Sequence, residues 1–173
     1  MKKFYIGTFI IILCAIITIA IYAFIEKGRY SKEFAHNLFE YSLPPHTQVL
    51  EKHYFYGYSF GHLLGSGGYM PVVANMRLST SLSEEEILSY YKNTPFFPYP
   101  HSNNKGVELE LYLPKDQILH KTTDGFYYSG KGDSTRRISS YKGSKASSSS
   151  EEKTQQYILQ ISSSFDYIFR LDS

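Results

Sequence analysis

The sequence predicts an α+β protein. An N-terminal transmembrane helix precedes a two-layer domain, in which one main helix packs on a mainly antiparallel sheet of about five strands. Three observations support this class. Residues 4–25 form an uncharged apolar run. Several later segments alternate apolar and polar side chains with period 2, as half-buried strands do. One later segment carries a helix start signal followed by an apolar stripe, so a short helix is expected across the sheet.

The apolar run, FYIGTFIIILCAIITIAIYAFI, is long enough to be a membrane anchor. As a helix it measures about 33 Å, and the hydrocarbon core of a bilayer is about 30 Å thick. The apolar part of a signal peptide is shorter, and the best cleavage pattern, which ends at Ala20, lies inside the run. An uncleaved anchor is therefore favoured over a cleaved signal peptide. Leu13 precedes Cys14 where lipoprotein patterns carry a small residue, which disfavours lipidation.

Charges on the two sides of the run predict the orientation of the anchor. Lys2 and Lys3 precede it, and the following residues 26–33 mix both signs. Because positive charge is retained on the cytoplasmic side, residues 1–3 are expected to be a cytoplasmic tail. The protein is then a single-pass protein of the cell membrane, with residues 26–173 outside. Cys14 is the only cysteine, so the domain beyond the anchor forms no disulfide.

Beyond the anchor, residues 26–42 are amphipathic at helical spacing and are expected to form a helical stalk. Pro44 and Pro45 end this helix, and residues 43–173 are expected to form the extracytoplasmic α+β domain. Period-2 alternation predicts strands at residues 53–60, 72–79, 107–113 and 165–172, with a weaker one at 154–161. The serines at 162–164 are expected to turn the last two into a hairpin.

The helix of the domain is signalled by a capping box. Ser83 can accept from the amide of Glu86, whose side chain can reach back, and Ile87, Leu88 and Tyr91 follow as an apolar stripe. Residues 94–106 are rich in Pro and Asn and read as a loop. Residues 139–153 are a low-complexity run of Ser, Lys and Glu, which predicts a mobile loop.

Composition and charge restrict the candidate partners. The net charge is +2 and 20% of residues are charged, so no strong overall field exists. Residues 114–145 carry seven basic against three acidic side chains, and Arg136 and Arg137 lie among them. On an outward-facing domain this region is suited to anionic lipid or an anionic wall polymer, with an ordinary soluble loop as the alternative. An envelope protein is a further candidate partner, and nucleic acid is not expected.

Motifs of known chemistry are not found. The glycine-rich stretch has neither the Lys of a P-loop nor the spacing of a nucleophile elbow, which leaves a flexible hairpin connection or a binding loop. Its candidate binding residues are Gly65, Gly67 and Gly68. The six histidines show no metal-ligand spacing, so neither a metal nor a cofactor is predicted. Glu108 and Glu110 share one strand face, which permits an acid–base pair, but a solvated sheet side is favoured.

Aromatic residues are the other candidate for binding. The chain has 17 Tyr and 12 Phe. Tyr54, Tyr56 and Tyr58 point to one side of the first predicted strand. Such a row serves either as a packed core face or as a stacking platform for a sugar or lipid.

The order of these parts resembles uncharacterised small single-pass membrane-anchored proteins of Gram-positive bacteria. The resemblance covers residues 43–91. It rests on Pro44, Pro45 and Thr47, on the glycines 65, 67 and 68, on residues 82–87, and on Tyr90 and Tyr91. Those proteins tend to read Gly-Asn-Gly-Asn-Gly at the turn, where this chain has Gly-Ser-Gly-Gly. The resemblance implies a location and an architecture, and it carries no activity.

Taken together, the sequence predicts a non-enzymatic binding or interaction domain anchored at the bacterial cell envelope. One alternative is a surface hydrolase or transferase of unfamiliar type. It would need a cleft that joins the glycine-rich loop to a base, such as His62 with Ser66 or an acid on the strand of Glu108 and Glu110. The other alternative is a sensor domain for a sugar or lipid that uses the tyrosine row.

Overall fold

The computed structural model describes residues 2–57, 70–100, 106–115, 117–131, 138 and 154–165. Two helices and six strands lie in these ranges. In chain order they are α1 (Lys2–Phe39), β1 (Thr47–Tyr56), β2 (Met70–Thr80), α2 (Glu84–Tyr91), β3 (Glu110–Tyr112), β4 (Gln117–Lys121), β5 (Phe126–Gly130) and β6 (Gln155–Phe165). The predicted α+β class, with an apolar N-terminal helix before an antiparallel sheet, is confirmed.

The strands form two antiparallel sheets, where the sequence predicted a single sheet of about five strands. The larger sheet has the order β1-β2-β6-β3, and β4 pairs with β5 in a separate hairpin. β2 confirms the strand expected at 72–79, and β1 begins at Thr47, earlier than expected. β3 is shorter than the predicted 107–113, because Val107 pairs with Phe97 in an isolated bridge instead.

The serines at 162–164 do not form the expected turn, and that prediction is wrong. They continue β6, where they pair with residues 71–73 of β2. β6 is a central strand between β2 and β3, and ladder pairing in a central strand overrides the weak turn preference of serine. Apart from Phe165, the strand predicted at 165–172 lies outside the described residues.

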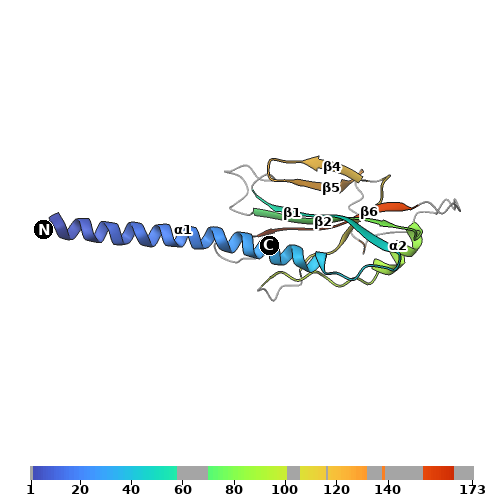
Figure 1. Ribbon diagram of the computed structural model, residues 1–173, viewed down its shortest axis with the longest axis horizontal. Helices are drawn as coiled ribbons and strands as arrows, with labels where there is room; N and C mark the ends of the chain where they lie inside the picture. Colours follow the sequence, from blue (N-terminus) through green and yellow to red (C-terminus); the bar gives the residue numbers. More distant parts are fainter. Residues whose placement is uncertain are drawn as a thin grey trace.

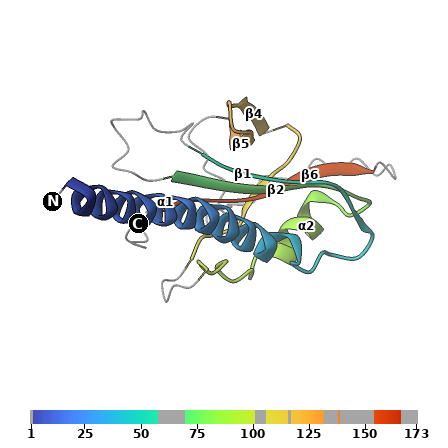
Figure 2. The ribbon, with the colours of Figure 1, turned by 60° about the vertical axis from the view of Figure 1, so that its left-hand side comes forward.

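Three layers are present, where two were expected. Figures 1 and 2 show α1 and α2 on one face of the larger sheet and the β4–β5 hairpin on the other. Alternation along the strands separates the two faces. One face packs against the helices in a single apolar core, with β2 and β6 contributing Val72, Ala74, Met76, Leu78, Tyr157, Leu159 and Ile161. The intervening side chains, among them Asn75 and Gln160, face the hairpin.

The stalk was expected at residues 26–42. Of these, residues 26–39 form the last part of α1, and this part belongs to the core. Phe34, Ala35 and Leu38 are 0% exposed. Tyr99 stacks on the ring of Phe34 with a centroid distance of 6.5 Å. The amphipathic face that the sequence displays is therefore buried against the sheet, and α1 is structurally part of the domain.

α2 begins as the capping box predicts. The amide of Glu86 donates to Ser83 Oγ at 3.3 Å, and the amide of Ser83 donates to Glu86 Oε2 at 2.8 Å. Both bonds satisfy amides that the first helical turn leaves without partners. Ile87 and Tyr91 bury the apolar stripe, and the Tyr91 hydroxyl lies 3.1 Å from that of Tyr157 on β6.

Candidate functional site

The first half of α1 projects from the domain and has the length and composition of a membrane-spanning helix. Between Ile6 and Ile25, the large apolar side chains whose burial is described are 45% to 71% exposed. A helix that is apolar all round is stable only when another apolar medium surrounds it. In the part of the chain that the structure describes, no residue of the most apolar stretch is buried against the domain, so the described part of the domain does not supply that medium.

The change from exposed to buried helix is abrupt. Ile25 is 60% exposed, whereas Ser31 is 0% exposed, and these two residues are six apart, or about 9 Å along the helix axis. Between them, Arg29 forms an ion pair with Glu26 at 2.8 Å. The hydroxyl of Tyr56 packs against Gly28, and a Cβ added to this glycine would lie 3.1 Å from the hydroxyl oxygen. The domain therefore starts within one to two helical turns of the end of the apolar half.

A hollow of about 320 Å³ lies at the same end of the sheet, lined by Tyr54, Phe55, Tyr56 and Asp124. It is formed where the end of β1 meets the β4–β5 turn. The carboxylate of Asp124 lies directly against Gly57 and leaves no space there for a Cβ. Ligand pockets usually begin near this volume and carry several convergent polar groups. Asp124 is the single charged residue among the described residues that line this hollow.

The predicted binding residues are only partly described. Tyr54 and Tyr56 are half-buried and lie against the apolar core on the α1 side. The Tyr54 ring meets that of Phe39 edge-on at 6.4 Å. Tyr58, the glycines 65, 67 and 68, and the arginines 136 and 137 lie outside the described residues. The tyrosine row and the basic region therefore remain predictions as binding surfaces.

A polar seam joins the larger sheet to the hairpin, and sequence reasoning missed it. The seam consists of Asn75, Glu110, Tyr112, Tyr128, Gln160 and Ser162. Gln160, only 2% exposed, uses its whole amide. It accepts from the Tyr128 amide at 2.9 Å, and it donates to the Tyr128 carbonyl at 3.0 Å and to Glu110 Oε2 at 2.7 Å.

Glu110 accepts hydrogen bonds from three side chains in this seam. Besides Gln160, Tyr112 donates to Oε2 at 2.7 Å and Ser162 donates to Oε1 at 3.0 Å. Burial, and then the charge of Glu110, raise the pKa of Tyr112, so its hydroxyl remains a donor at neutral pH. The expectation of a solvated side is therefore wrong for Glu110. The signal in the sequence was a glutamine within the apolar run YILQI, since a polar residue there needs a buried partner.

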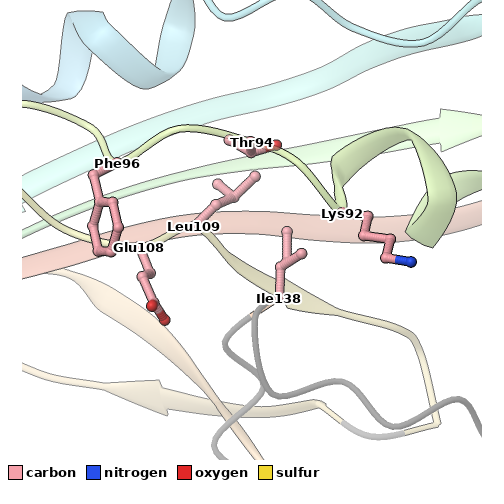
Figure 3. A pocket seen from close by; sticks show the side chains of 6 residues that line it. All are labelled: Lys92, Thr94, Phe96, Glu108, Leu109 and Ile138. Carbon is pink, nitrogen blue, oxygen red and sulfur yellow. The ribbon is translucent and has the colours of Figure 1, made fainter.

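The other glutamate of that strand segment, Glu108, lies elsewhere. It lines a small hollow of about 80 Å³ together with Lys92, Thr94, Phe96, Leu109 and Ile138. Figure 3 shows the Lys92 ammonium and the Glu108 carboxylate pointing in different directions from this hollow. Its volume is far below that of a usual ligand pocket, and its two charged groups do not converge on one point.

Two of the described histidines, His53 and His120, take part in ring stacking. His53 lies parallel to Phe126 with a centroid distance of 4.2 Å, and its Nε2 is buried with no hydrogen-bond partner. Burial lowers the pKa of His53. His120 stacks on Tyr127 at 4.7 Å and shares a hydrogen bond of 2.7 Å with Ser129. Within the described ranges, no three His, Cys, Asp or Glu side chains gather as metal ligands would.

Comparison of the chain with protein-family models, with curated proteins and with solved structures finds no match.

Proposed function

We propose that this chain is a single-pass membrane protein that holds a non-enzymatic binding domain against the outer face of a bacterial cell membrane. Residues 4–25 are the anchor, the N-terminus is cytoplasmic, and the α+β domain lies in the cell envelope. The observation that carries the proposal is the continuity of α1, because one helix runs without a break from the exposed apolar half into the core of the domain.

This continuity supports an anchor rather than a leader that is removed. Phe34 and Leu38 hold the second half of the helix in the core, and no turn separates them from Ile25. The apolar half and the domain are thus one structural unit, and the domain is presented at a fixed short distance from the membrane. A flexible linker would instead let it sample a large volume.

Binding is favoured over catalysis by the positions of Glu108 and Glu110, the two candidate catalytic groups that the structure describes. The other two candidates, His62 and Ser66, lie outside the described residues. Glu110 accepts hydrogen bonds from three side chains of the larger sheet, and one of these, Gln160, also bonds to Tyr128 of the hairpin. The Glu110 carboxylate is therefore part of the packing between the sheet and the hairpin. Glu108 lines a separate, small hollow. The partner is proposed to be an envelope protein, an anionic lipid or a wall polymer.

Protease accessibility in intact cells tests the proposal. The full chain carries different epitope tags at its two ends, and the membrane fraction is washed with alkaline carbonate. We expect protease to remove the C-terminal tag from intact cells, the N-terminal tag to be cut only after lysis, and the chain to remain in the washed membrane.

A matched control is the double variant Ile11→Arg/Ile17→Arg. Each arginine near the middle of a span costs about 2.5 to 3.5 kcal/mol of insertion free energy, so this variant should leave the membrane fraction. If the unaltered chain is released by carbonate, the anchor is wrong. If its C-terminal tag is cut only after lysis, the orientation is wrong.

A further inference from the structure

We infer that the end of the domain formed by Tyr56 of β1 and the β4–β5 turn sits in the lipid headgroup layer of the membrane. This inference rests on the proposed anchor and names the partner of one particular surface of the domain. The depth of each described residue relative to the membrane is set by its distance from the end of the apolar half of α1, measured along the axis of that helix.

Tyr56 lies at the level of the membrane boundary. Its hydroxyl is against Gly28, three residues beyond Ile25, or about 4.5 Å along the helix axis. The headgroup layer on each side of a bilayer is about 5 to 7 Å thick, the difference between a whole bilayer and its hydrocarbon core. The phenol group therefore falls inside this layer when residues 4–25 span the core.

The β4–β5 turn lies at the same end. Asp124 in this turn contacts Gly57 after β1. The next residue, Gly125, packs against Phe55, and a Cβ added to Gly125 would lie only 2.6 Å from the Phe55 ring. Figure 1 shows this turn on the side of the domain from which the first half of α1 extends. Tyr56 and the turn thus form one membrane-facing end.

The opposite end of the domain is well away from the bilayer. The hydroxyl of Tyr90 on α2 donates to the backbone carbonyl of Ser42 at 3.2 Å, and Ser42 follows the end of α1 at Phe39. From Gly28 to Phe39 the helix rises about 16 Å. A helix tilt of about 20°, which is usual for spanning helices, leaves this separation almost unchanged.

The chemistry of the membrane-facing end is suited to lipid headgroups. Tyrosine has an apolar ring and a polar tip and is enriched where hydrocarbon meets water. The exposed charged groups described at this end have both signs, Arg29 and Lys121 against Asp124, so the inference does not depend on a net charge of these groups. The rigid connection through α1 holds this end in the headgroup layer, and strong affinity for one lipid is not required.

Single tryptophan probes test the inference, because the chain has no tryptophan of its own. The variants are Tyr56→Trp and Thr123→Trp at the membrane-facing end, Tyr90→Trp at the far end, and Ile16→Trp in the span. Each full-length variant is reconstituted into phosphatidylcholine vesicles that carry a spin label on the headgroup or deep in the acyl chain. Tryptophan fluorescence is compared with that in unlabelled vesicles.

We expect the headgroup label to reduce the fluorescence of Tyr56→Trp and Thr123→Trp about twofold or more and to leave Tyr90→Trp within about a tenth. The deep label should quench Ile16→Trp. If Tyr56→Trp disturbs folding, as circular dichroism would show, the exposed turn position in Thr123→Trp carries the test alone.

Two failures are distinguishable. If Ile16→Trp is quenched by the deep label but the membrane-facing variants are no more quenched than Tyr90→Trp, this inference is overturned and the anchor stands. If Ile16→Trp is not quenched and the chain does not float with the vesicles, the proposed anchor is itself wrong and the inference falls with it.

Discussion

Replacement of Glu110 by glutamine tests whether the polar seam holds the hairpin on the sheet. The Glu110 carboxylate accepts from Tyr112, Gln160 and Ser162 at 2.7 to 3.0 Å. Hydrogen bonds to a charged partner contribute about 1.5 to 3 kcal/mol each. Glutamine keeps the shape, but it removes the charge and turns an NH₂ group toward groups that donate. Because the site is half-buried and water partly compensates, we expect Glu110→Gln to lower the free energy of unfolding by about 2 to 4 kcal/mol.

The assay is equilibrium unfolding of the full chain in non-ionic detergent, followed by the near-ultraviolet circular dichroism of its tyrosines. The amide of Tyr128, which donates to Gln160, should also exchange its hydrogen faster in the variant. Glu40→Gln is the matched control, since the Glu40 side chain is 66% exposed and should change stability by less than about 0.5 kcal/mol. A cost below about 1 kcal/mol for Glu110→Gln, with unchanged exchange at Tyr128, would refute the reasoning.

Three further predictions concern single side chains. Phe34→Ala should lower the unfolding free energy of the domain by about 3 to 5 kcal/mol, because the ring is wholly buried. Phe9→Ala, in the exposed half of the same helix, should leave domain unfolding unchanged, and an equal effect of both would contradict the assigned core. Ser83→Ala should cost about 1 kcal/mol through loss of the helix cap, and a cost near zero in the same unfolding assay would rule out that role. The lowered pKa of His53 means that the unfolded chain binds more protons, so stability should fall as the pH drops below the ordinary histidine pKa of about 6.5. His53→Phe keeps the stacking on Phe126 and should flatten this part of the pH profile in denaturant titrations, whereas an unchanged profile would show that His53 does not cause it.

Local signals predicted several elements correctly. The cap at Ser83 depends on a hydroxyl and a carboxylate three residues apart, so nothing distant is needed to form it. The alternation in residues 72–79 likewise marked β2, because period 2 is a property of the strand itself. Asp and Gly are residue types that turns favour, and Asp124 and Gly125 lie in the turn that joins β4 to β5.

Features that depend on distant partners were not predictable in the same way. Glu110 looked solvated because its strand alternates cleanly, but Gln160 and Ser162 of the neighbouring strand β6 donate to it, and the hairpin bonds to the same Gln160. The serines 162–164 carry a turn composition, but β2 supplies a partner for each of them. In both cases the deciding contact comes from a segment at least 30 residues away, and side-chain pattern alone does not select among such segments.

The sequence by itself determined that the chain has a helix able to cross a membrane, because length and lack of charge are local properties of residues 4–25. It also determined the α+β class and the cap of α2. Only the tertiary structure decided what the amphipathic residues that follow the apolar run do. The same pattern serves a free stalk or a core helix, and burial of Phe34 and Leu38 against the sheet made it core, since that burial removes more apolar surface from water than a free stalk would.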